Sequence, residues 1–158
     1  MVSAPLSAAR PQPDSKARLR LWIRLLRASR QIEGVTRERL KRQFDATLPR
    51  FDVMAALHRR PDGMLMSEIS RFLMVSNGNV TGIVDRLVAD GLVVRSQRNG
   101  DRRTSFISLT RKGNGAFANM AAAHERWIDE LLGGVSAREA VDLSTKLKSF
   151  RSDWENEA

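Results

Sequence analysis

Cysteine is absent from this chain of 158 residues, and histidine occurs only at His58 and His124. The absence of cysteine excludes disulfide bonds, thiolate metal sites and redox sensing through a thiol. Two histidines far apart in the sequence do not supply the compact ligand set that a zinc site needs. We therefore expect no metal site and no cofactor.

Long apolar runs are also missing. No stretch approaches the roughly 20 apolar residues that a membrane-spanning helix requires. The start of the chain, MVSAPLSAARPQPDS, lacks a charged segment followed by an apolar core. We expect neither a membrane span nor a secretory signal peptide, and we predict a cytoplasmic protein.

Acidic residues are fewer than basic ones. The chain has 27 Lys and Arg against 18 Asp and Glu, a formal net charge of +9, and 42% of its residues are hydrophobic. That hydrophobic fraction is enough for a core, and the length fits one domain. The positive surplus suits a polyanionic partner, either nucleic acid or an anionic membrane. Most of it lies in residues 1–50, which hold 12 basic and 4 acidic side chains.

Apolar spacing predicts helices at both ends of the chain. Residues 1–15 are rich in Ala, Pro and Ser without periodicity, and we expect them to be a disordered tail. A helical period follows over about 16–45. Near the other end, a helix is expected over 111–132. Ser136 and a Glu three residues later then predict a capping box at the start of a last helix.

The middle of the chain predicts helices followed by a hairpin. Pro49 suits the first turn of a short helix, and Ser67 and Ser76 each suit the N-cap of a further one. Residues 92–97 and 104–110 are rich in β-branched and apolar residues, as in strands. The order predicts a mainly α fold with a small β-wing.

The helix after Ser76 combines an apolar stripe with a face of small polar residues. Asn can make paired hydrogen bonds to adenine, Arg can do so to guanine, and free amides at a helix start can hold a phosphate. The alternative is an ordinary amphipathic surface helix. The candidate DNA-binding residues on this helix are Ser76, Asn77, Gly78, Asn79, Thr81 and Arg86.

The loop between the two predicted strands is basic. An Arg that enters a minor groove gains from the focused negative potential there, and a nearby Asp can orient its guanidinium. The alternative is a solvated hairpin tip. Joined to the preceding helices, the loop predicts a winged helix-turn-helix that binds DNA. The candidates here are Arg98, Asp101, Arg102 and Arg103.

Three segments resemble the MarR (multiple antibiotic resistance regulator) family of bacterial transcription factors. They are LPRFDVMAAL, LMVSNGNVTGIVDRLVADGLVVR and DRRTSFISLTRKG, and the detailed likeness covers about residues 48–115. The resemblance implies a winged helix-turn-helix over about 48–112 within a single domain over 16–158. It also implies a symmetric homodimer with dimerisation helices over about 16–45 and 115–155.

The same resemblance implies how DNA is bound. Two winged domains would read successive major grooves of a pseudo-palindromic operator, with the recognition helix over 77–90. The family's Asp-x-Arg pair falls on Asp101 and Arg103, which makes Arg103 the expected minor-groove residue. Many members carry Thr-Arg in the recognition helix, whereas this chain has Thr81 and Gly82, so the operator sequence cannot be carried over.

Members of the family commonly bind small anionic aromatics between the dimer helices and the winged domain. The resemblance therefore implies a repressor relieved by a ligand, with an aromatic acid or its coenzyme A thioester as the possible effector. Candidate pocket residues are Trp22, Phe44, Arg50 and Phe51. For each of them, plain core or surface is the alternative role.

Two rival functions remain open at the level of sequence. A winged fold can bind protein instead of DNA, and the basic helix from Lys16 with Trp22 suits a membrane surface. An enzyme is the least favoured class, because the sequence shows no convincing set of nucleophile, base and orienting group.

Overall fold

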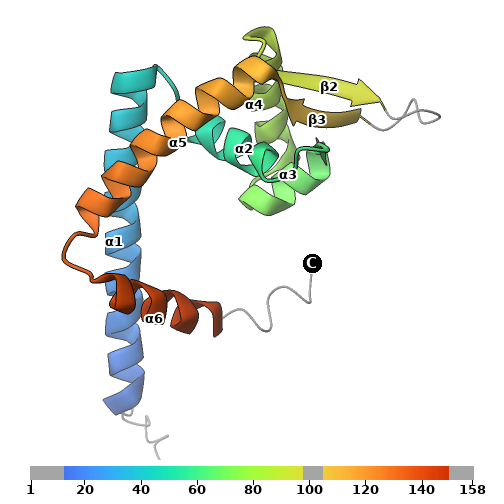
Figure 1. The fold of residues 1–158 in the computed structure, drawn as a ribbon. Coiled ribbons are helices and arrows are strands. Elements are labelled where there is room, and N and C mark those ends of the chain that lie inside the picture. The colour runs from blue at the N-terminus through green and yellow to red at the C-terminus, as the bar shows by residue number, and fades with distance from the viewer. Residues whose placement is uncertain (1–12, 98–104, 150–158) are drawn as a thin grey trace, which may run out of the picture.

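The computed structural model describes residues 13–97 and 105–149, which form helices and a small sheet (Figure 1). A long first helix stands beside a lobe of short helices and strands, and α5 runs from this lobe back to it. In chain order the elements are α1 Pro13–Phe44, α2 Leu48–His58, β1 Met64–Leu65, α3 Met66–Leu73, α4 Asn77–Ala89, β2 Val93–Gln97, β3 Ser105–Leu109, α5 Arg111–Leu131 and α6 Ala137–Lys148.

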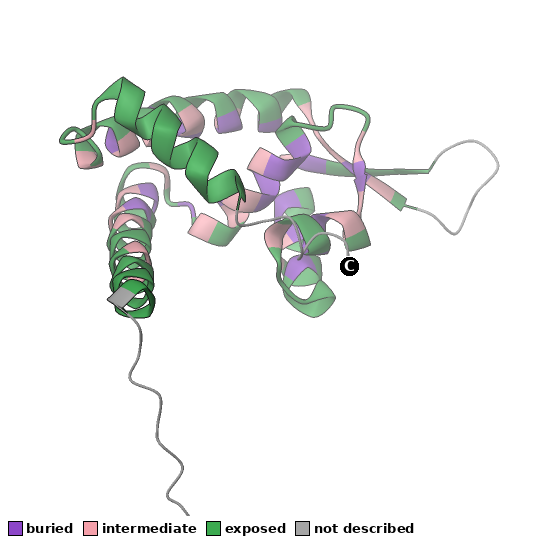
Figure 2. Ribbon diagram, turned by 90° about the horizontal axis from the view of Figure 1, so that it is seen from below, coloured by how far each residue is buried: buried purple, intermediate pink, exposed green. Residues whose placement is uncertain are grey.

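The core lies mainly in the lobe formed by α2, α3, α4 and the sheet. Val53, Ile69, Val80 and Leu87 are fully buried there, and Figure 2 shows the buried residues gathered in this part of the molecule. Complete burial of such a side chain contributes about 1.5–3 kcal/mol. The apolar stripe of α4 is thus fixed from behind by α2 and α3, which leaves its opposite face open.

Three antiparallel strands form the sheet in the order β1-β3-β2. Ile107, at the centre of β3, pairs with Met64 of β1 on one side and with Arg95 of β2 on the other. The two wing strands confirm the expectation from sequence. Strand β1 was not expected, because two residues are too few to show an alternating pattern.

A row of aromatic and histidine rings joins α5 to α2 and α1. Arg39 of α1 also contacts α5, and its guanidinium donates hydrogen bonds of 2.7 and 3.1 Å to the Glu130 carboxylate. The ring centroids are 4.8, 5.6, 4.9, 6.5 and 6.3 Å apart along the order His58, Phe117, Phe51, His124, Trp127 and Phe44. These contacts fix α5 against both neighbouring helices.

Helix α6 and the first half of α1 carry apolar side chains that lie exposed among the described residues. α6 has no buried residue, as its exposed colour in Figure 2 shows. Leu143 of α6 is 54% exposed, and Leu19 and Trp22 of α1 are 57% and 58% exposed. Within the described residues, no helix combines the length and the apolar character needed to cross a bilayer.

Two helix starts differ from the sequence-based boundaries. α1 begins at Pro13, inside the expected tail, because Pro fits the first turn of a helix. α3 begins at Met66, and the Leu65 N–H donates to Glu68 Oε2 at 2.8 Å, so Ser67 lies within the helix and is not its N-cap. The capping box at Ser136 is confirmed by its hydrogen bonds with Glu139.

Candidate nucleic-acid interface

A tight turn sets α4 at an angle to α3. Met74 adopts the left-handed conformation at φ 53°, and its N–H donates to the Arg71 carbonyl at 3.2 Å. The Val75 N–H donates to the Ser70 carbonyl at 3.1 Å, which satisfies another carbonyl at the end of α3. The chain then enters α4 through Ser76 as N-cap.

The outer face of α4 collects the residues expected to read DNA. All six candidates on this helix are exposed, whereas Val80, Val84 and Leu87 are fully buried on the other side. Ser76 makes no side-chain capping bond, so the first amides of α4 lack a side-chain acceptor and suit an anion. The exposed candidates are Ser76, Asn77, Gly78, Asn79, Thr81 and Arg86.

Two glycines on this face are not required by any close contact with the described residues. A Cβ atom added at Gly78 or Gly82 would meet nothing within 4 Å. The packing would therefore tolerate a side chain at either position. Helix propensity would favour one, because glycine inside a helix costs about 1 kcal/mol relative to alanine. A smooth helix surface is what close approach to another backbone requires.

The wing extends from the same lobe. Asp85 of α4 forms an ion pair with Arg95 of β2, which ties the helix to the first wing strand. Arg95, a basic side chain of the wing, is therefore paired within the protein. The loop candidates Arg98, Asp101, Arg102 and Arg103 lie outside the described residues.

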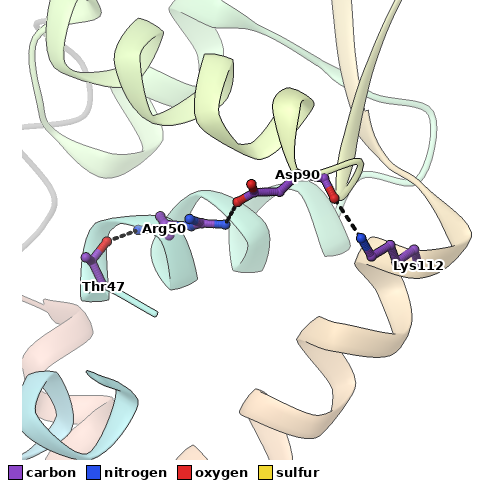
Figure 3. A network of polar contacts seen from close by, with 4 residues as sticks. All are labelled: Thr47, Arg50, Asp90 and Lys112. Atoms are coloured by element: carbon purple, nitrogen blue, oxygen red, sulfur yellow. Dashed lines mark hydrogen bonds and ion pairs between the residues drawn. The ribbon is translucent and has the colours of Figure 1, made fainter. Parts of the chain in front are cut away.

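The last residue of the predicted recognition helix is held from two sides (Figure 3). The Asp90 carboxylate forms an ion pair with Arg50 of α2. The Asp90 backbone carbonyl accepts a hydrogen bond of 2.8 Å from Nζ of Lys112 in the first turn of α5. The sequence did not predict this network, because contacts between residues that lie 40 and 22 positions apart leave no periodic signal.

The structure brings together only part of the expected effector set. Phe44 and Arg50 line a cavity of about 250 Å³ between α1, α2 and α5. Phe51 is buried in the aromatic row instead, against Phe117 and His124. Trp22 lies 22 residues before Phe44 on the same helix, a distance of about 33 Å along its axis. The four residues therefore do not form one pocket within a single chain.

A larger hollow of about 760 Å³ lies between α1, α5 and α6. Its wall includes Thr36, whose buried hydroxyl has no hydrogen-bond partner in the structure. Burial lowers the pKa of His124, which also lines the hollow. On neighbouring α2, burial raises the pKa of the Asp52 carboxyl, and Glu33 raises it further. The hollow thus combines a mostly apolar wall with a few polar groups.

Residues 13–97 and 105–149 contain no group of three His, Asp or Glu side chains placed to hold an ion.

Known proteins share both the sequence and the fold. Residues 46–105 match the MarR family. The HTH-type transcriptional regulator MhqR of Bacillus subtilis is 30% identical over 130 residues, which cover 82% of this chain and 87% of MhqR. The crystal structure of a MarR family transcriptional regulator from Silicibacter pomeroyi is 35% identical, with a TM-score of 0.73 over 88% of this chain and 96% of that one. A MarR mutant from E. coli complexed with operator DNA has the same fold at 24% identity, with a TM-score of 0.72 over 82% and 92% of the two chains.

Proposed function

The chain belongs to the MarR family of DNA-binding transcriptional regulators, and we propose that it is a homodimeric repressor that a small ligand releases from a pseudo-palindromic operator. The family and the fold are those of regulators and not of enzymes. The observation that carries the proposal is the exposed polar face of α4, whose other side is anchored in the core. The proposal implies a cytoplasmic protein.

In this proposal, α4 enters the major groove and the wing reaches the adjacent minor groove. The exposed residues on α4 from Ser76 to Arg86 contact bases and phosphates. Arg103 enters the minor groove with Asp101 beside it, and Arg98 and Arg102 contact the backbone. Basic side chains supply affinity through the phosphates, while base and groove contacts supply sequence choice.

Dimerisation is supported by apolar surfaces that the described part of the chain leaves exposed. The apolar residues of α1 and α6 are exposed, including Trp22 and Leu143. A second copy would bury this apolar surface.

Light scattering after size exclusion tests the dimer. We expect a mass near 36 kDa, twice the 17.8 kDa of one chain. Leu143→Glu should shift the mass toward the monomer, because a charge cannot be buried unpaired in an apolar interface. Val94→Glu is the matched control, since Val94 is an exposed apolar residue on the wing strand β2. A monomeric wild-type protein would refute the dimer.

The effector proposal rests on the cavity beside Arg50. Its volume of about 250 Å³ suits a small aromatic acid, with Phe44 for the ring and Arg50 for the carboxylate. A coenzyme A thioester would need the hollow of about 760 Å³. Benzoate should release the protein from DNA while uncharged benzamide should not. If benzoate and benzamide release the protein from DNA equally, the proposed recognition of a carboxylate is wrong.

The proposed DNA binding is tested by fluorescence anisotropy. The duplex is the intergenic DNA beside the protein's own gene, with a scrambled duplex as control, at two salt concentrations. We expect tight, salt-sensitive binding to the native duplex alone, and weaker binding by Arg103→Ala without loss of folding. Weak binding that salt does not change would favour a protein-binding module. Co-sedimentation with anionic vesicles in place of DNA binding would favour the membrane alternative.

A further inference from the structure

Asp90 is an unfavourable residue for the end of a helix. It follows α4 directly as its C-cap, where the helix dipole places partial negative charge. A carboxylate at this position opposes that dipole, and an uncharged side chain would suit the helix better. The choice of Asp here therefore calls for a reason outside α4 itself.

Arg50 supplies one such reason. Its guanidinium forms an ion pair with the Asp90 carboxylate, and its side chain is 24% exposed while that of Asp90 is 49% exposed. The backbone of Arg50 is fixed in the first turn of α2, where its N–H donates to Thr47 Oγ1 at 3.4 Å. Figure 3 shows the Arg50 side chain extending from α2 to the end of α4. The guanidinium is thus directed at Asp90.

Lys112 holds the same residue through its backbone. Its ammonium group donates to the Asp90 carbonyl at 2.8 Å, and Thr110 Oγ1 donates to the next carbonyl, that of Gly91, at 2.8 Å. Both donors belong to the start of α5. A cation at the end of a helix favours the dipole, so Lys112 also offsets part of the effect of the Asp90 charge.

We infer that Arg50, Asp90 and Lys112 form a clamp that positions the recognition helix, so that its loss weakens operator binding without removing a DNA contact. The inference rests on the proposed operator binding. The apolar stripe already holds α4 against the core, but apolar packing is not directional. The clamp adds directional contacts from α2 and α5 at the end of α4, and these fix where the exposed face points.

Asp90→Asn is the decisive variant. It removes a negative charge, which suits the helix dipole and reduces repulsion of the DNA phosphates. By themselves, these two effects would favour a stable fold and tighter DNA binding. We nevertheless expect operator affinity to fall by about fivefold per subunit, because α4 loses the contact that fixes its orientation. The thermal midpoint should stay close to that of the wild type. Glu38→Gln is the charge-matched control, since Glu38 pairs with Arg42 on α1 at 3.4 Å.

Arg50→Gln separates positioning from direct contact with DNA. If Arg50 only orients α4, affinity falls while the slope of log affinity against log salt stays the same. The control is Arg42→Gln, which removes the same charge from α1. Arg50→Asp combined with Asp90→Arg restores the ion pair in reverse and should regain most of the affinity that either single variant loses.

Amide hydrogen exchange reports on the clamp without DNA. In Asp90→Asn and Arg50→Gln, the amides of Asp90, Gly91 and Leu92 should exchange faster, while those of α6 remain unchanged. Wild-type affinity in Asp90→Asn would overturn the clamp, as would a salt slope reduced by about one in Arg50→Gln. If the wild-type protein does not distinguish its duplex from the scrambled one, the proposed function fails. Hydrogen exchange alone then decides whether the three residues hold α4.

Discussion

A methyl group on Gly113 would lie 1.9 Å from the carbonyl oxygen of Leu92. Gly113 is buried in the first turn of α5, and Leu92 directly precedes the wing strand β2. The backbone of α5 therefore packs directly against the backbone that leads from the recognition helix into the wing. The first turn of α5 also carries Lys112, so close backbone contact and the clamp occur at one junction.

Gly113→Ala should destabilise the protein by about 1–3 kcal/mol, because a backbone carbonyl cannot move aside as a flexible side chain would. Chemical denaturation measures the change. Gly115→Ala is the matched control, since a Cβ there meets nothing within 4 Å, and it should stabilise the helix by up to about 1 kcal/mol. Equal stability of the two variants would contradict the packing described for Gly113.

Gly82→Ala should make the protein more stable and its operator binding weaker. Alanine is favoured over glycine inside a helix by about 1 kcal/mol, and an added Cβ meets no atom of the chain within 4 Å. The methyl group would instead protrude from the face proposed to approach DNA. Denaturation and anisotropy measured on the same preparation test both effects. Unchanged operator affinity would place Gly82 outside the DNA contact.

Met74→Gly should stabilise the turn between α3 and α4 by up to about 1 kcal/mol. Met74 has a φ of 53°, which costs a residue with a Cβ about 1–2 kcal/mol, whereas glycine has no such strain but loses more entropy on folding. The side chain is 91% exposed, so its removal sacrifices little packing. Val75→Gly, at a residue whose φ is not positive, should destabilise the protein when measured by the same thermal unfolding.

The stability of the protein should fall in mild acid because of His124. Burial lowers the pKa of His124 below its usual 6.5, so the folded state binds a proton less readily than the unfolded state. The resulting decrease in the free energy of unfolding is absent above pH 6.5 and grows as the pH falls from there through the pKa of the folded state. His124→Phe should reduce the loss between pH 7.5 and 5.5 by less than about 1 kcal/mol, because the ring keeps some solvent contact. Identical urea unfolding profiles over pH would exclude this role.

The sequence predicted what depends on local periodicity and capping. The stripe of Val80, Val84 and Leu87 placed the polar face of α4 outward, and Ser136 with Glu139 predicted the start of α6. Each of these two signals is carried by residues that lie within a few positions of one another. The strand character of residues 92–97 and 104–110 predicted the wing, the resemblance to MarR regulators agreed with this order of elements, and the fold confirms it.

What the sequence did not predict depends on contacts between distant residues. Arg50 was expected in a ligand pocket; it lines a cavity but also pairs with Asp90, and only the fold brings these two charges together. Trp22 and Phe51 were grouped with Arg50 by residue type. The length of α1 and the packing of the aromatic row place them elsewhere. Residue type predicts which chemistry is available, while tertiary structure decides which residues share a site.

Helix α1 is long enough to serve as a lever. It spans 32 residues, or about 48 Å, and its last third is anchored through Leu40, which is buried in the core, and through Arg39, which pairs with Glu130 of α5. A rotation of about 5° about one end of a rod of that length displaces the other end by about 4 Å. Rotations too small to break the contacts of Leu40 and Arg39 would therefore shift the exposed end of α1, and any second copy held there, by a distance comparable to one base-pair step.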